Sequence, residues 1–133
     1  MRQLLLILLG IAIGGLATAN IVNALRQRDA YPRGLMNVMQ HHFAALRKQA
    51  HEQHCDQDVK VHLTAMRLMS DQIEDAIYAG HQPDPEFHTD AQRLRDALDA
   101  ADNKATSSNP CAALIPVLGR VGDACDTCHR SYR

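Results

Sequence analysis

The chain has 133 residues, of which 46% are hydrophobic and 22% are charged, a balance typical of one ordinary globular domain. Its formal net charge is −1 with histidine neutral, and no run of Lys and Arg residues is available to neutralise phosphates, which argues against a nucleic-acid partner. There is no Trp, and there are only two Phe and three Tyr. A small core so poor in aromatic side chains leaves room for a bound group.

The start of the chain has the pattern of an export signal. An apolar, uncharged stretch follows Arg2, and residues 17–19 read Ala-Thr-Ala. Residues 1–19 are therefore a candidate signal peptide, cut before Asn20. The alternative is an uncleaved membrane anchor over residues 4–25, because about 20 apolar residues span a bilayer as a helix. Both interpretations place the rest of the chain outside the cytoplasm.

Apolar residues recur every three or four positions from Tyr31 onward, and no segment alternates with period two, so we expect only helices. The first predicted helix begins after Pro32 and ends in the polar stretch 51–54. The second covers residues 56–78 and is stopped by Gly80, which takes a positive φ without strain.

The third and fourth helices have clear start signals. Asp84 is the expected N-cap of the third, followed by Pro85 at the first helical position, where a missing N–H costs nothing. Asn109 and Pro110 play the same parts in the fourth. Pro116 removes a hydrogen bond inside that helix, so either the helix kinks there or its regular part begins near that residue.

Short connections between four amphipathic helices predict an all-α, antiparallel up-down-up-down four-helix bundle over residues 32–133. The residues expected to face inward are Met36, Met39, Phe43, Leu46, Ala50, Val59, Leu63, Met66, Ile73, Ile77, Phe87, Ala91, Leu94, Leu98, Ala101, Cys111, Leu114, Leu118, Val121, Cys125 and Cys128.

The strongest motif is C-x-x-C-H at residues 125–129. Residues at i and i+3 share a helix face, so the thiols of Cys125 and Cys128 can both bond one porphyrin. His129 follows at i+4 and can reach the iron from the same side, as a proximal ligand does. The sequence thus predicts one covalent haem c bound by these three residues.

Other uses of the motif are less well supported. A dithiol redox motif is expected to accompany a βαβ pattern, and none is visible. A zinc site would need a second pair of ligands, whereas Cys55 and Cys111 are isolated from each other in sequence. The stretch 51–55 contains two His and a Cys, but its polar setting indicates a solvated loop.

The bundle topology also predicts which distant residues meet. The first and third connections lie at the same end, which places Cys55 near Cys111 and predicts a disulfide between them. Such a bond would close a loop of 57 residues and contribute about 3–4 kcal/mol in the chain-entropy model. The alternative is two free thiols. At the opposite end, Met36 should lie near His129.

Residues 121–133 read VGDACDTCHRSYR, which resembles the V/I-G-x-x-C-x-x-C-H-x-x-Y/F-R ending of class II c-type cytochromes, the cytochrome c prime family. The resemblance covers residues 31–133 and implies a four-helix bundle with haem near the end of its last helix. Many members have five-coordinate iron and bind small gases. A low-spin branch has a Met as sixth ligand and transfers electrons, and Met36 falls at that position. Met39, one turn on, is the alternative ligand, and an iron without a Met ligand is the third case.

The resemblance implies a periplasmic electron-transfer cytochrome that meets redox partner proteins, and nothing in the sequence indicates an enzyme. A haem module that binds nitric oxide or carbon monoxide is the second interpretation. A haem-bearing accessory subunit of a membrane complex, held at the inner membrane by an uncleaved N-terminus, is the third. Family members often form homodimers. Among Arg33, Arg130 and Arg133, we select Arg33 as the partner of a haem propionate.

Overall fold

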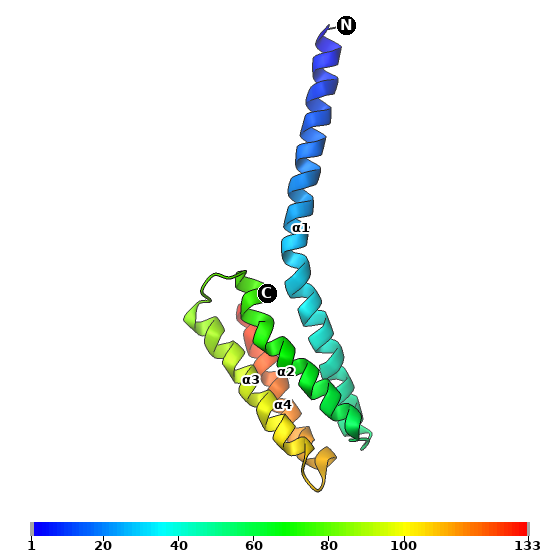
Figure 1. Ribbon diagram of the computed structural model, residues 1–133, viewed down its shortest axis with the longest axis vertical. Coiled ribbons are helices and arrows are strands. Elements are labelled where there is room, and N and C mark those ends of the chain that lie inside the picture. The colour runs from blue at the N-terminus through cyan, green and yellow to red at the C-terminus, as the bar shows by residue number, and fades with distance from the viewer. Residues whose placement is uncertain (1, 133) are drawn as a thin grey trace. The chain divides into compact units, whose positions relative to one another are not determined.

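A computed structural model describes the backbone of residues 2–132, and the side chains of these residues other than 2, 4–6, 8, 12 and 25–29. Over this range the chain forms four helices and no strand: α1 (Arg2–His51), α2 (Gln57–Tyr78), α3 (Pro85–Ala105) and α4 (Pro110–Ser131) (Figure 1). It divides into two compact units, Met1–Arg33 and Gly34–Arg133. The expected all-helical class is confirmed.

Helix α1 departs from the prediction. It begins at Arg2 and runs without interruption through Pro32, so the expectation that the first helix begins after Pro32 is wrong. A proline inside a helix removes one backbone hydrogen bond. Strong helix formers such as Leu, Ala and Arg are frequent before it, and they favour helix on that side as well.

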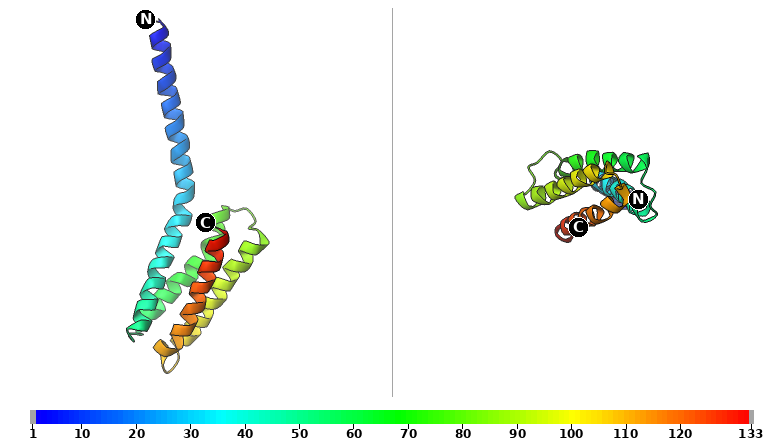
Figure 2. Two further views of the ribbon diagram at one scale, coloured as in Figure 1. Left: turned by 180° about the vertical axis from the view of Figure 1, so that it is seen from behind. Right: turned by 90° about the horizontal axis from the view of Figure 1, so that it is seen from below.

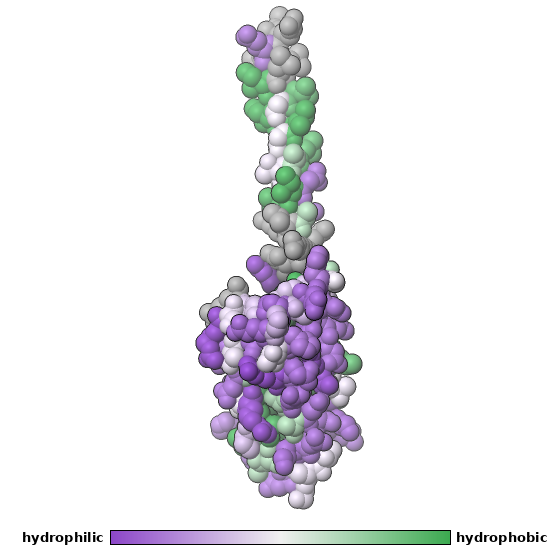
Figure 3. All heavy atoms as spheres, turned by 90° about the vertical axis from the view of Figure 1, so that its left-hand side faces the viewer, coloured by the Kyte–Doolittle hydropathy of each residue, from purple (hydrophilic) through white to green (hydrophobic). Residues whose placement is uncertain are grey.

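The unit Met1–Arg33 presents mostly apolar side chains to its surroundings, including Ile11, Ile13 and Leu16, each more than half exposed (Figure 3). Among the fully described residues, no helix is both long enough and apolar enough to cross a membrane. The candidate signal peptide and the candidate anchor both include Leu4, Leu5 and other positions whose side chains lie outside the described residues.

The helix ends follow the sequence signals closely. Asp84 accepts a hydrogen bond from the backbone N–H of Phe87 at 2.9 Å, and Pro85 is the first residue of α3, as predicted. Asn109 and Pro110 begin α4 in the same manner. The stop of α2 uses two residues, Ala79 at φ 48° and Gly80 at φ 83°.

Pro116 lies within α4, which is already helical from Pro110. Of the two alternatives for this proline, a regular helix beginning only near Pro116 is therefore wrong. The single hydrogen bond lost at Pro116 does not end the helix, because the surrounding residues bury an apolar stripe that includes Leu114, Val117 and Leu118.

Within the unit Gly34–Arg133, successive helices run in opposite directions (Figures 1 and 2). Contacts between neighbours agree with this: Arg95 of α3 bonds Glu74 of α2 at 2.6 Å, and Tyr132, which follows α4, bonds Asp84 at the start of α3 at 2.8 Å. The face of the bundle seen in Figure 3 is mostly hydrophilic. The result is a helical bundle whose apolar faces meet in one core.

The core contains almost all the residues that periodicity assigned to it. Phe87, Leu114 and Val121 are examples, and each has 0% exposure. Ile77 is the exception, since 37% of its surface is exposed. Ala76 takes the buried position at 8% exposure, because a step of three residues from Ile73 keeps it on the inner face of α2.

Candidate functional site

A cavity of about 360 Å³ lies inside the bundle, between residues of all four helices. Most of its wall is apolar. The apolar side chains that line it are Met36, Met39, Phe43, Met66, Ile73 and Leu94. Met66 and Met39 are almost fully buried, whereas Met36 and Phe43 are partly exposed.

The residues predicted from the sequence meet at this cavity. Met36 reaches it from α1, and Cys125, Cys128 and His129 reach it from α4. Arg33 belongs to the unit Met1–Arg33, so its place relative to the cavity is not defined. Two segments that are far apart in the sequence of this unit thus contribute to one wall, because α1 and α4 are neighbours. Their proximity is clear at Gly122 of α4, where an added methyl group would lie 3.4 Å from the ring of Phe43.

Cys125 and Cys128 form no disulfide and are partly buried. Burial, with smaller contributions from Asp126 and Cys128, raises the pKa of Cys125 to about 11. Burial, and then the charge of Asp90, also raises the pKa of Cys128. Both thiols are therefore protonated at neutral pH. Reactive dithiol motifs have the opposite character, with a lowered pKa at a helix N-terminus, so the setting of this pair in the last turns of α4 does not suit thiol exchange.

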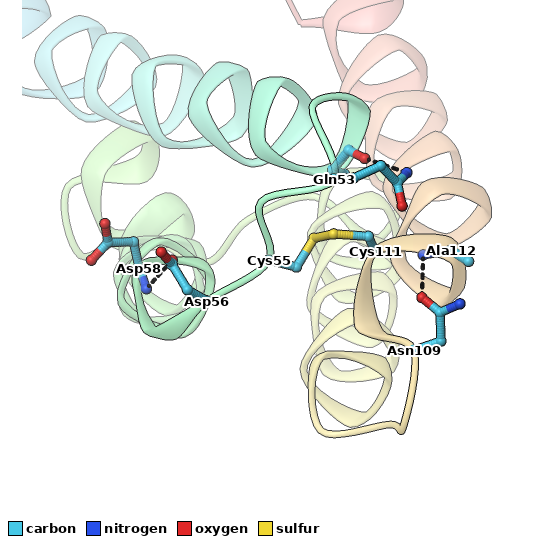
Figure 4. Close-up of a disulfide and its surroundings, with 8 residues drawn as sticks. Gln53, Cys55, Asp56, Asp58, Asn109, Cys111 and Ala112 are labelled. Carbon is cyan, nitrogen blue, oxygen red and sulfur yellow. Dashed lines mark hydrogen bonds between the residues drawn. A yellow bond between two sulfur atoms is a disulfide. The ribbon is translucent and has the colours of Figure 1, made fainter.

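The other two cysteines are bonded to each other. The sulfur atoms of Cys55 and Cys111 are 2.13 Å apart and their Cα atoms 5.5 Å apart (Figure 4). Cys55 lies in the connection between α1 and α2, and Cys111 lies in the first turn of α4. This is the pairing that the topology predicts, and it leaves only the C-x-x-C thiols free.

The end of α4 is attached to the start of α3 through Asp84. The phenol of Tyr132 donates to one carboxylate oxygen at 2.8 Å and that of Tyr78 to the other at 2.5 Å. Hydrogen bonds from Tyr78, from the Phe87 N–H and from Tyr132 hold the pKa of Asp84 at about 2. Phe87 packs edge-on against both phenol rings, with centroids 4.9 and 5.1 Å away. Together these contacts fix the position of the helix turn that carries His129.

Two further residues near the motif were missed by sequence reasoning. Asp90 is only 3% exposed and is paired with Arg93 at 2.6 Å. Arg47 lines the cavity and also a neighbouring hollow of about 600 Å³, and its guanidinium lies 5.8 Å from the centre of the Phe43 ring. Neither residue belongs to a motif. The only sequence signal for Arg47 is its position one helical turn after Phe43, which was expected to face inward.

Among the described residues, no group of three or more His, Cys, Asp or Glu side chains is arranged to hold a metal ion. In the stretch 51–55, His51 and His54 are exposed and Cys55 is used by the disulfide. An axially ligated haem iron needs only two protein ligands, because the porphyrin supplies the others.

No protein-family model, curated protein or solved structure matches the chain. The fold and the site therefore define it as a helical bundle with an internal, mostly apolar cavity, whose wall carries two free thiols and an imidazole from one helix turn.

Proposed function

We propose that the unit Gly34–Arg133 is a c-type cytochrome domain that transfers single electrons. In this proposal Cys125 and Cys128 attach one haem covalently, His129 is the proximal iron ligand and Met36 the distal one. The observation that supports it most is the shared cavity, since Met36 of α1 lines the same cavity as the C-x-x-C-H motif of α4.

The residues present suit a haem. The mostly apolar lining is compatible with the faces of a porphyrin, and the partly buried thiols are free and on one side of α4. The haem would supply a one-electron iron couple. The chain's own contribution is to hold both axial ligands on rigid helices and to keep the His129 turn fixed through Tyr132 and Asp84. A fixed ligand pair limits reorganisation when the charge of the iron changes.

Met36 decides between electron transfer and gas binding. A thioether ligand closes the sixth position and raises the reduction potential, whereas an unligated apolar face leaves that position open to nitric oxide or carbon monoxide. Met36 is partly exposed and Met39 is 5% exposed, and both line the cavity. We assign the ligand to Met36 because its side chain is less enclosed by the core than that of Met39.

Visible spectroscopy of the haem-loaded protein tests this assignment. We expect sharp α and β bands in the reduced form and a weak band near ~695 nm in the oxidised form, as iron–Met bonding produces. Met36→Ala should remove the ~695 nm band and allow rapid carbon monoxide binding. Met39→Ala is the matched control and should keep it. A wild-type spectrum that is already high-spin would identify a gas-binding module instead.

The proposed setting is the periplasm, with redox proteins as partners. The apolar first unit is consistent with export. If this unit is not cleaved from the mature chain, an accessory subunit of a membrane complex is favoured. N-terminal sequencing after cell fractionation separates the two cases. A soluble chain beginning at Asn20 supports the free carrier, an intact chain in the membrane fraction supports the subunit, and haem-loaded protein in the cytoplasm contradicts both.

A further inference from the structure

Two histidines from neighbouring helices face each other, and neither of them lines the cavity described above. His42 of α1 and His62 of α2 place their Nδ1 atoms 2.8 Å apart, with ring centroids separated by 5.1 Å. Both side chains are partly exposed.

From this geometry we infer that His42 and His62 form a divalent transition-metal site with cis, tetragonal coordination. Nitrogen atoms in cis positions, each 2.0–2.1 Å from one metal ion, lie about 2.8–3.0 Å apart, whereas tetrahedral positions separate them by about 3.3–3.4 Å. The 2.8 Å separation, which in the metal-free pair is the length of an N–H···N hydrogen bond, is close to the cis spacing and shorter than the tetrahedral one. Ni²⁺ and Cu²⁺ prefer such geometry and accept imidazole ligands.

The protons of the pair allow metal binding without a large penalty. In the metal-free pair, one Nδ1 donates a hydrogen to the other. On binding, that hydrogen moves to Nε2 of the same ring by exchange with water, so each ring keeps one proton and both Nδ1 lone pairs face the metal. Water fills the remaining coordination positions, because both rings are at the surface.

The two ligands come from different helices, which makes the site rigid. His42 lies nine residues before the end of α1 at His51, and His62 lies five residues after the start of α2 at Gln57. The adjacent apolar residues Leu46, Val59 and Leu63 are buried at 1–2% exposure. The helix positions are therefore set by the core before any metal binds, and the second nitrogen binds at high effective concentration. The ring of His41 lies 5.6 Å from that of His42, edge-on, and so is a neighbour of the site.

The test is calorimetric titration of the untagged, haem-loaded protein with Ni²⁺ at pH 7.5. We expect one Ni²⁺ per chain, and His42→Ala or His62→Ala should weaken binding by about tenfold or more, since one imidazole alone loses the chelate gain. His42→Asn tests the same point with less change in packing, because an amide still hydrogen-bonds His62 but is a poor ligand for Ni²⁺.

The control variant is His51→Ala with His54→Ala, which removes two exposed histidines at and just after the end of α1. It should bind Ni²⁺ as the wild type does. Equal binding by wild type and the folded His42→Asn variant, or no binding by the wild type, would overturn the inference and leave the pair as a hydrogen bond only. The haem spectrum reports separately on the proposed cytochrome function, so either proposal can fail without the other.

Discussion

At the residue scale, the stability of the α3–α4 junction depends on the charge of Asp84, which caps α3 and receives both phenols. Because its pKa is lowered from 3.8 to about 2 in the folded state, the folded form favours the carboxylate. The contribution is present above pH 4 and is lost as the pH falls towards 2.

Asp84→Asn tests this, because the amide keeps the shape and can still cap α3 but carries no charge. We expect a lower unfolding temperature at pH 7 and a smaller further loss between pH 4 and pH 2 than in the wild type. Thermal unfolding followed by circular dichroism measures both. Asp102→Asn, an exposed change on the same helix, is the control. Parallel pH profiles for wild type and Asp84→Asn would show that the carboxylate has no such role.

The effect of a positive charge at the proposed haem site is also argued at the residue scale. Arg47 lines the cavity, whereas Arg33 belongs to the separate first unit. A positive charge near the haem favours the reduced iron. Arg47→Gln should therefore lower the reduction potential by about tens of millivolts. Solvent partly screens the effect, because Arg47 is exposed. Arg33→Gln is the matched variant. Potentiometric titration compares the two, and a larger shift for Arg33 would support Arg33, the residue selected from the sequence, over Arg47.

At the element scale, the disulfide joins the α1–α2 connection to the first turn of α4, at the end of the bundle opposite the C-x-x-C-H motif. Replacing Cys55 and Cys111 together by Ala should lower the free energy of unfolding by about 3–4 kcal/mol, because the bond restricts the unfolded chain over 56 residues of separation. Urea unfolding of both proteins measures the difference.

A thiol titration gives an independent check of the same pairing. Unfolded, unreduced protein with haem attached should contain no reactive thiol, since two sulfurs form the disulfide and the other two form thioethers. Two reactive thiols in that sample would be incompatible with a Cys55–Cys111 bond.

Elements with local signals were the predictable part of this molecule. The caps Asp84 and Asn109 act within three residues, so a single sequence contains all the information they need. The start of α1 was missed because Pro32 was interpreted as an N-terminal signal, although a proline also fits inside a longer helix at the cost of one hydrogen bond.

The candidate site was predictable in its linear part and in one residue from a distant helix. The thiols and imidazole of residues 125–129 follow from helical spacing, and Met36 from bundle topology. The contacts of Asp84 with two phenols and the position of Arg47 at the cavity depend on how the helices rotate and approach each other. Such rotation is set by packing of the whole core, which periodicity alone does not specify.

At the scale of the whole molecule, the chain combines an apolar first unit, Met1–Arg33, with a bundle that contains the cavity, the free thiols and the imidazole. In our proposal the first unit directs export or membrane attachment, and the second unit transfers electrons. All of it depends on covalent haem attachment at Cys125 and Cys128.

Intact-mass spectrometry tests that attachment most directly. The chain is produced in a host that matures c-type cytochromes, alongside a variant with Cys125→Ala and Cys128→Ala. We predict that the wild-type mass exceeds that of its polypeptide by one haem and that the variant shows no such addition. A wild-type mass equal to that of the bare polypeptide under these conditions would contradict the account.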